Sequence, residues 1–292
     1  MIRNRRRLAA IIAGAASLGL LGSACAPGGG PIYGGPPTAN WRIQTNTVNV
    51  VESQDKVCAL FCVNINDEPY TLNLAFRVKV GEANSATGFL VQGAEYNDIG
   101  EGETETMVGA QRAVTQFPAV TMVDLIDLAF GAKLEIAGVW SWQMESDQFG
   151  VQSAANSVLN LVLAALNTTV AAGTLPSDTN TIVSTLLGSL GFGGAFSLLG
   201  TTLLGVTGLQ DDAVGSRMYL GLGVTGTLGG VIDATAGGTP FPALAIPVVN
   251  IPPDISGGRL FRWGALASFT DNFDAPPAVD GIYNTNYQLS SY

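Results

Sequence analysis

Near the middle of the chain, 63 consecutive residues from Gln148 to Gln210 carry a single charge, Asp178. In the first half, 151–173, polar residues recur at helical spacing in an aliphatic segment, which predicts a helix with a narrow, uncharged polar face. Pro176 ends that helix, and the turn and N-cap residues after it favour a second one. The sequence therefore predicts an apolar helical hairpin over 151–208.

The hairpin has two alternative locations. Each half exceeds the roughly 18 uncharged apolar residues that mark a candidate membrane span. Against spanning, the first half has a polar face, the second half contains seven glycines, and no Lys or Arg flanks either half as an anchor. We favour burial of the hairpin against the protein's own sheet and keep membrane contact through 151–208 as the alternative.

The first 26 residues have the organisation of an export signal peptide. Four arginines between Arg3 and Arg7 precede an apolar run, Leu8–Leu21, and small residues follow it. The run Asn4-Arg5-Arg6-Arg7-Leu8 resembles the twin-arginine export motif, without its usual Phe and trailing Lys. We expect an exported bacterial protein, secreted or associated with the cell envelope, and leave the choice between ordinary secretion and the twin-arginine route open.

Cys25 offers a second route to the membrane. The segment Leu21–Cys25 resembles a bacterial lipobox displaced by one residue, and a lipid on Cys25 would tether the chain to the envelope. We favour cleavage without lipidation. Residues 27–40 are then a Gly/Pro-rich tether, and 41–292 form a single β domain that contains the insertion at 151–208.

Composition excludes several functions. Removing the leader takes four of the 13 basic residues and none of the 23 acidic ones, which leaves nine basic residues and a formal charge of −14. Such a chain repels nucleic acid. It has no histidine, so Ser-His-Asp and Cys-His nucleophiles and imidazole zinc sites are ruled out. Catalysis would have to depend on carboxylates, tyrosines or lysines, and we expect no enzyme.

Cys58 and Cys62 remain after removal of the leader. In an exported protein two such close cysteines are expected to form a disulfide. Residues four apart on one extended strand lie about 13 Å apart, beyond disulfide reach. A Cys58–Cys62 disulfide therefore requires the segment 57–63 to turn.

Alternation of apolar and polar residues predicts a mainly β fold. The clearest strands are 72–80, 134–144 and 218–224, with 41–51, 89–96, 260–267 and 282–289 as weaker ones, and 119–130 fits either a strand or a short helix. One-sided alternation favours an antiparallel β-sandwich, or an open barrel, whose sheets each have one wet face, with the helical hairpin as an insertion. Trp140 and Trp142 fall on the apolar face, so we assign them to packing.

The run 221–226, Gly-Leu-Gly-Val-Thr-Gly, matches the dinucleotide-binding pattern in letters. That motif needs a helix next and an acidic residue about 20 positions later. The sequence continues Thr227-Leu228-Gly229-Gly230, and the nearest acid, Asp233, comes too early. In a chain with 37 glycines we interpret the match as chance.

Acidic loops make calcium the one cofactor to consider. Asp67 and Glu68 precede the clearest strand, and Asp211 and Asp212 end the apolar stretch. Calcium takes six to eight oxygen ligands, often from loops at one end of a sandwich. The simpler explanation is that these acids keep an exported protein soluble, since no stretch matches the calcium-loop pattern, and only convergence of the four residues would favour a metal site.

The leading hypothesis is an exported, non-enzymatic β-sandwich with a binding or structural role at the cell surface. The main alternative is a membrane-active protein that inserts 151–208 into a bilayer. A weaker alternative is a carboxylate-dependent hydrolase. Glu135 and Glu145 cannot be its catalytic pair, because ten residues of one strand separate them by about 33 Å, whereas such pairs lie about 5–9.5 Å apart.

Overall fold

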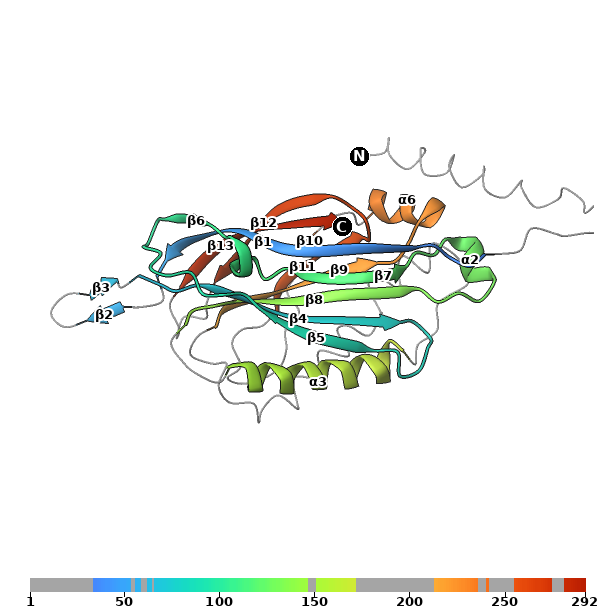
Figure 1. Cartoon of the computed structure of the whole chain (residues 1–292), viewed down its shortest axis with the longest axis horizontal. Helices are drawn as coiled ribbons and strands as arrows, with labels where there is room; N and C mark the ends of the chain where they lie inside the picture. Colours follow the sequence, from blue (N-terminus) through green and yellow to red (C-terminus); the bar gives the residue numbers. More distant parts are fainter. Residues whose placement is uncertain are drawn as a thin grey trace, which may run out of the picture. The chain divides into compact units, whose positions relative to one another are not determined.

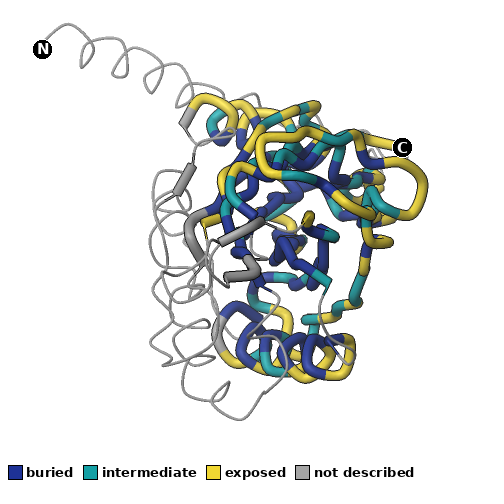
Figure 2. Tube along the Cα trace, turned by 90° about the vertical axis from the view of Figure 1, so that its left-hand side faces the viewer, coloured by how far each residue is buried: buried dark blue, intermediate teal, exposed yellow. Residues whose placement is uncertain are grey.

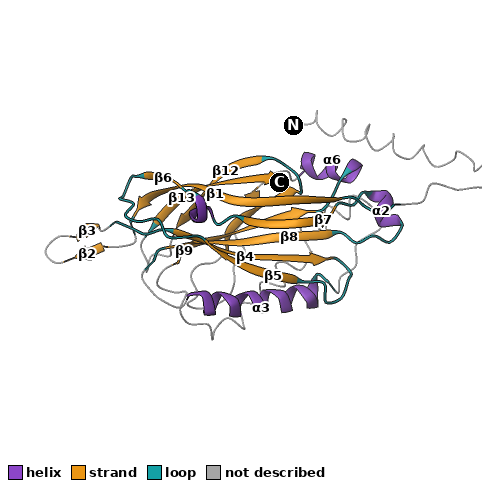
Figure 3. Ribbon diagram, in the orientation of Figure 1, coloured by secondary structure: helices purple, strands orange, loops and turns teal. Residues whose placement is uncertain are grey.

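Strands dominate the computed structural model of the chain (Figures 1 and 3). The structure describes residues 34–53, 56–58, 62–64, 66–146, 151–171, 213–235, 240–241, 255–274 and 281–292.

The predicted segments 89–96 and 260–267 extend past strand ends, but each segment that alternation predicted overlaps at least one of the described strands. The described strands are β1 (Thr38–Glu52), β2 (Lys56–Cys58), β3 (Cys62–Asn64), β4 (Tyr70–Lys79), β5 (Thr87–Gln92), β6 (Thr104–Thr106), β7 (Thr115–Thr121), β8 (Glu135–Met144), β9 (Ala213–Leu222), β10 (Pro240–Phe241), β11 (Ile255–Arg262), β12 (Ala267–Asp274) and β13 (Ile282–Ser291). The described helices are η1 (Gly109–Arg112), α2 (Leu125–Ala129), α3 (Val151–Thr169) and α6 (Gly226–Thr235). The ambiguous segment 119–130 contains both a strand end and a helix, β7 and α2.

A five-stranded antiparallel sheet is built around β1. Its order is β12-β13-β1-β6, and β7 also pairs with β1. Strand β13 lies along most of one edge of β1, while β6 and β7 share the other edge, pairing with Thr47–Asn49 and Thr38–Ile43. The long first strand therefore joins both ends of the described chain into one layer.

The second sheet has six strands in the order β10-β11-β9-β8-β4-β5. All neighbouring pairs are antiparallel except β9 and β11, which run parallel with helix α6 between them in sequence. The prediction of a mainly β protein with two packed sheets is confirmed, but only one sheet is purely antiparallel, and the described strands do not close into a barrel.

Two apolar cores lie on the two faces of the six-stranded sheet. One fills the space between the sheets, where the Trp41 and Trp263 rings meet at 4.1 Å between centroids and Phe117 packs against both. The other lies on the opposite face, where buried residues of α3 pack with those of the sheet. Trp140 and Trp142 belong to this second core, as predicted, with ring centroids 4.9 Å apart.

The expectation of one wet face per sheet is wrong for the six-stranded sheet. Every residue of β8 is buried, including Ser141 and Gln143 on the polar side of its alternation. The side chains of these two residues reach across to the hydroxyl of Tyr287 on β13, so the polar face meets the other sheet instead of water. In Figure 2 most strand residues are buried, and exposed residues follow the loops and one side of α3.

The first half of the apolar stretch forms the predicted helix, α3, which contacts β4 and β5 on the outer face of the sheet (Figure 1). Gly88 on β5 permits this approach, since a Cβ there would lie 2.9 Å from Leu159 and 3.1 Å from Leu163. The expected second helix, within 181–208, lies outside the described residues. Among the helices that the structure describes, none combines the length and hydropathy needed to cross a bilayer.

Candidate functional site

Four carboxylates are buried: Asp67, Glu135, Glu145 and Asp271. Glu145 accepts from the backbone amide of Glu68 at 3.5 Å, and the other three have the larger sets of donors. Ionised carboxylates are costly to bury unless donors surround them, so their partners show what they do. Each lies next to different strands, and each has donors from elements distant in sequence.

Asp67 joins the beginning of β4 to β1 and β13. The hydroxyl of Ser53 donates to its Oδ1, and the Tyr283 hydroxyl donates to its Oδ2 at 2.7 Å. The Asp67 backbone also pairs with Ile99 through two hydrogen bonds of 3.0 and 2.9 Å. The carboxylate thus holds one end of the sandwich together.

Glu135, the first residue of β8, is held by Arg77 of β4 and by the backbone of β7. The guanidinium of Arg77 donates to Oε1 from Nε at 2.6 Å, and the amide of Thr121 donates to Oε2 at 2.8 Å. Arg77 also reaches the carbonyl of Pro118 at 2.8 Å. This ion pair therefore connects the two sheets.

Asp271 of β12 pairs with Arg259 of β11, whose Nη2 lies 2.7 Å from Oδ1, and the Tyr219 hydroxyl donates to Oδ2 at 3.0 Å. Burial raises the pKa of the Tyr219 hydroxyl well above its usual value, and nearby Tyr287 and Asp271 add to the increase. The hydrogen bond to Asp271 raises the pKa of Arg259. The guanidinium of Arg259 also lies 4.8 Å from the ring centroid of Phe269.

A chain of neutral polar groups crosses the space between the sheets beside these carboxylates. The Gln143 amide donates to Tyr287 at 2.7 Å and to Thr71 at 3.0 Å, and the Thr71 hydroxyl lies 3.0 Å from that of Thr45. The Tyr287 hydroxyl also lies 2.9 Å from Ser141, and burial raises its pKa. These bonds fix the register of the two sheets.

The three carboxylates share one property: both oxygens of each accept hydrogen bonds from the protein itself. A catalytic acid or base must instead reach a proton of the substrate. The geometry of Asp67, Glu135 and Asp271 therefore suits structural anchors. Glu135 and Glu145 lie at opposite ends of β8, as the sequence required.

The proposed calcium ligands are only partly covered by the structure. Asp67 accepts from Ser53 and Tyr283, Glu68 is half-buried, and Asp211 and Asp212 lie outside the described residues. Among the residues that are described, no three His, Cys, Asp or Glu side chains gather in a way that could hold a metal ion. Calcium binding through these four residues stays a prediction.

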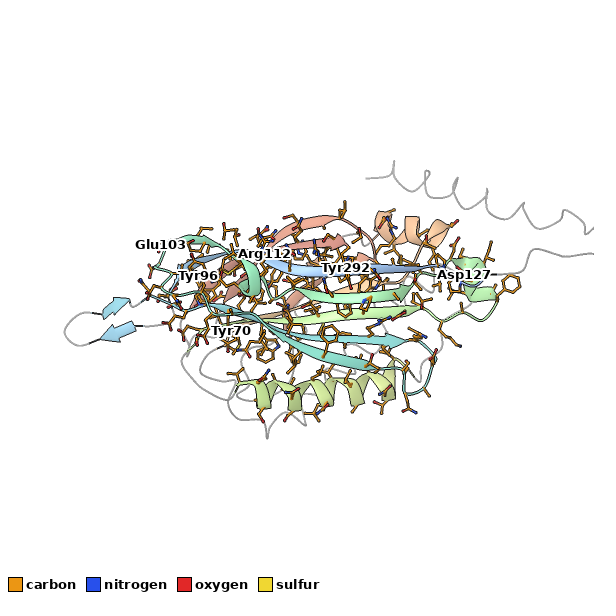
Figure 4. The ribbon with its side chains drawn as sticks, viewed as in Figure 1. Tyr70, Tyr96, Glu103, Arg112, Asp127 and Tyr292 are labelled. Carbon is orange, nitrogen blue, oxygen red and sulfur yellow. The ribbon has the colours of Figure 1, made fainter. Side chains whose placement is uncertain are left out.

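Other acidic residues are dispersed along the sandwich. Figure 4 places Glu103 and Tyr96 at one end and Asp127, on α2, at the other. The Tyr96 hydroxyl donates to Glu105 at 2.7 Å, which raises the pKa of Tyr96. These acids therefore do not form a single cluster.

Cys58 and Cys62 lie opposite each other on the paired strands β2 and β3. Cys58 ends β2, Cys62 begins β3, and the two residues are partners in the antiparallel register. Such partners have Cβ atoms about 4.5–5.5 Å apart, which small adjustments bring to disulfide distance. The antiparallel pairing of β2 with β3 provides the reversal of direction that a disulfide requires, and the bond itself stays a prediction. Cys25 lies outside the described residues.

The run 221–226 begins in the last residues of β9, crosses a short loop and ends at the first residue of α6. The implied absence of a following helix is wrong, because α6 begins at Gly226, separated from the end of β9 by residues 223–225. Leu228 and Ile232 bury one side of α6 in the core, which offsets the poor helix propensity of its glycines.

A protein carboxylate occupies the end of α6 where a dinucleotide phosphate would bind. Asp124, just before α2, accepts from the amide of Leu228 at 3.1 Å, and a Cβ at Gly226 would lie 2.3 Å from its Oδ2. The positive end of a helix attracts anions, and here Asp124 supplies the charge. The sequence did not predict this strand-loop-helix geometry. The Asp124 carboxylate at the N-terminus of α6 nevertheless supports the interpretation of the glycine pattern as chance.

The fold and these sites define a protein with one antiparallel and one mixed β-sheet packed face to face and a helix on the outer face of the mixed sheet. No protein-family model, no curated protein and no solved structure matches the chain.

Proposed function

We propose that the protein is exported and has a non-enzymatic binding or structural role at the cell surface. The observation that carries this proposal is the saturation of the buried carboxylates Asp67, Glu135 and Asp271 by donors from neighbouring strands. These groups stabilise a rigid two-sheet scaffold. The basic and apolar leader over residues 1–26 supports export.

The membrane-active alternative draws on the length of the apolar segment 151–208. It requires α3 to leave the sheet, where Ala155, Val158 and Leu166 are fully buried. Asn167 also accepts a hydrogen bond from the backbone of Ala86 at 3.0 Å, just before β5. These contacts favour a helix that stays in the fold. The hydrolase alternative has no support from Asp67, Glu135 and Asp271, because the donors around these three leave none of their oxygens unbonded. The fourth buried acid, Glu145, accepts from the amide of Glu68 at 3.5 Å.

Export is tested by expressing the full chain in a bacterial host and measuring the location and N-terminal mass of the product. We expect a shortened protein outside the cytoplasm. A variant lacking residues 1–26 is the control and should stay in the cytoplasm. Full-length, uncleaved protein confined to the cytoplasm would overturn the proposal. The paired substitution Arg5→Lys and Arg6→Lys should block export only if the twin-arginine route is used.

The membrane-active alternative is tested by locking α3 to the sheet. Cysteines introduced as Ala86→Cys and Asn167→Cys replace the hydrogen-bonded pair and should form a disulfide, to be mapped by mass spectrometry. We expect no leakage of dye from liposomes with the oxidised or the reduced variant. Leakage by the wild type and by the reduced variant that disappears on oxidation would instead establish membrane insertion as the function.

A further inference from the structure

Strand β5 leaves one edge of the six-stranded sheet open within the described part of the chain. It is the terminal strand, and only β4 pairs with it. Its sequence, Thr87–Gln92, has no charge and no proline, and Phe89 on it is 38% exposed. Edge strands usually carry a charge, a proline or a cover that prevents pairing with another chain. Among the described residues, β5 carries neither a charge nor a proline, and no strand besides β4 pairs with it.

One terminal strand of the other sheet, β12, provides a contrast. Two arginines donate to carbonyls of β12: Arg217 bonds Asn272 at 2.8 Å, and Arg259 bonds Thr270 at 3.4 Å. Strand β12 also contains Asp271 and Asp274. These charges and side-chain donors discourage strand addition at β12, whereas β5 contains no charged residue.

Helix α3 continues this neutral surface. It contains no charged residue, and its exposed side chains are all polar or small. Several of them bond to their own helix: Asn156 donates to the carbonyl of Gln152 at 2.8 Å, and Ser157 donates to that of Ser153 at 3.1 Å. Burying these polar groups in an interface costs less free energy than burying polar groups without hydrogen-bond partners.

We propose that two copies of this chain form a two-fold symmetric dimer by antiparallel pairing of their β5 strands, with their α3 helices packed side by side. Self-association of an acidic chain, with a formal charge of −10 before processing, needs a surface without repulsion between like charges. The neutral β5–α3 surface meets that requirement. A two-fold axis also matches the surface to itself, and the dimer does not depend on the proposed function.

Standard dimensions agree with this arrangement. Since α3 contacts both β4 and β5, its axis lies about half a strand spacing inside β5. Strands are about 4.8 Å apart, so a two-fold axis at the β5 edge would place the two helix axes about 10 Å apart. That is the upper end of the usual range of about 8–10 Å for packed helices.

The position of the two-fold axis along α3 follows from its contacts with β5. Ala86 lies near Asn167 and Gly88 near Leu159 and Leu163, so the helix runs antiparallel to the strand. The middle of β5 is about 5–7 Å beyond Gly88, equivalent to about four residues of helix. A two-fold axis through the middle of β5 therefore passes close to Asn156.

The test measures the mass of the purified protein by sedimentation over a wide concentration range. We expect a dimer whose affinity falls at least about tenfold in Asn156→Lys and in Asn156→Glu, because like charges would meet near the axis. An equimolar mixture of the two variants should regain the dimer. The control Ala234→Lys adds the same charge at an exposed position of α6 and should not change the affinity.

Hydrogen exchange supplies a second readout. The backbone amides of Thr87–Gln92 should become more protected as the wild-type concentration rises, and less so in Asn156→Lys. Thermal melting of the variants checks that the fold is intact, which we expect because Asn156 is exposed. A wild type that stays monomeric at all concentrations, or an Asn156→Lys protein that dimerises as well as Ala234→Lys, would overturn the proposal.

Discussion

The hydroxyl of Tyr283 donates a 2.7 Å hydrogen bond to the carboxylate of Asp67, which lies 216 residues earlier in the chain. Ser53 bonds the other oxygen of the same carboxylate. Strand β13, the end of β1 and the segment before β4 therefore meet at one buried carboxyl group. Because Ser53, Asp67 and Tyr283 are all buried, water does not compete for these hydrogen bonds.

Tyr283→Phe should therefore destabilise the fold. The substitution removes one donor and leaves a buried carboxylate oxygen with fewer hydrogen bonds, which we expect to lower the free energy of unfolding by about 1–3 kcal/mol. Urea denaturation measures the change. Tyr292→Phe, at a residue that is 45% exposed, is the matched control and should stay within about 0.5 kcal/mol of the wild type. Equal stabilities of the two variants would contradict the role of Tyr283.

Two buried phenols predict loss of stability at alkaline pH. Burial raises the pKa of Tyr219 and of Tyr287, so both stay protonated in the folded state when the unfolded phenols ionise near pH 10. The free energy of unfolding should be unaffected by these groups below about pH 10. Above it, each should contribute a decrease of up to about 1.4 kcal/mol per pH unit until its folded pKa is reached.

The measurement is chemical denaturation at a series of pH values between neutral and strongly alkaline. The double variant Tyr219→Phe/Tyr287→Phe loses both titrating groups, so its stability should fall less steeply above pH 10 than that of the wild type. The two substitutions also remove hydrogen bonds and lower stability at neutral pH, so the slope is the informative quantity. Identical slopes would show that the two phenols do not couple to folding.

The strands were predictable from alternation, because an apolar face alone produces the period-two pattern. The pattern is the same whether the polar face meets water or another part of the protein. What the polar side faces was not predictable. Ser141 and Gln143 look solvent-facing in sequence, yet they bond to Tyr287, a residue more than 140 positions later. A polar side chain satisfied by a distant strand has the same local pattern as one satisfied by water. One signal was available: Tyr283 and Tyr287 lie four residues apart on β13, on the same face, and their hydroxyls can pair with polar groups of another strand.

Long-range contacts also explain why the helix after 221–226 was missed. The segment has glycines that disfavour a helix locally, and its N-terminal partner, Asp124, lies 104 residues before Leu228. Packing of Leu228 and Ile232 into the core completes the stabilisation. The parallel pairing of β9 with β11 has no local signature either, so the mixed sheet could not be told from an antiparallel one.

Asp124→Ala should expose the N-terminus of α6. Loss of the carboxylate removes the acceptor of the Leu228 amide, and we expect a cost of about 0.5–2 kcal/mol. The vacated helix end should then attract anions, so sulfate should raise the melting temperature of the variant more than that of the wild type. Thermal melts in sulfate and in chloride at equal ionic strength measure the difference.

Asp233→Ala is the control for that experiment. It removes an exposed ion pair with Arg262 at 2.8 Å, further along α6, and should change stability by less than about 1 kcal/mol without a specific sulfate response. If sulfate stabilises the wild type and Asp124→Ala equally, Asp124 does not occupy an anion site.

Two glycines, Gly138 and Gly230, should respond to alanine with opposite signs. A Cβ at Gly138 on β8 would lie 2.3 Å from the Phe76 ring, so Gly138→Ala forces overpacking and should cost about 1–3 kcal/mol. Gly230 on α6 has no heavy atom within 4 Å of the added Cβ, and Gly230→Ala should stabilise by up to about 1 kcal/mol through helix propensity. Thermal and urea denaturation measure both changes.

The Gly138 effect can be assigned to its neighbour by a double-mutant cycle with Phe76→Leu. Phe76→Leu alone should destabilise, since it leaves a gap in a fully buried position. Combined with Gly138→Ala, the smaller side chain makes room for the new methyl group, so the double variant should lose less stability than the sum of the single changes. Additive losses would mean that the strain at Gly138 arises from the backbone of β8 and not from contact with the Phe76 ring.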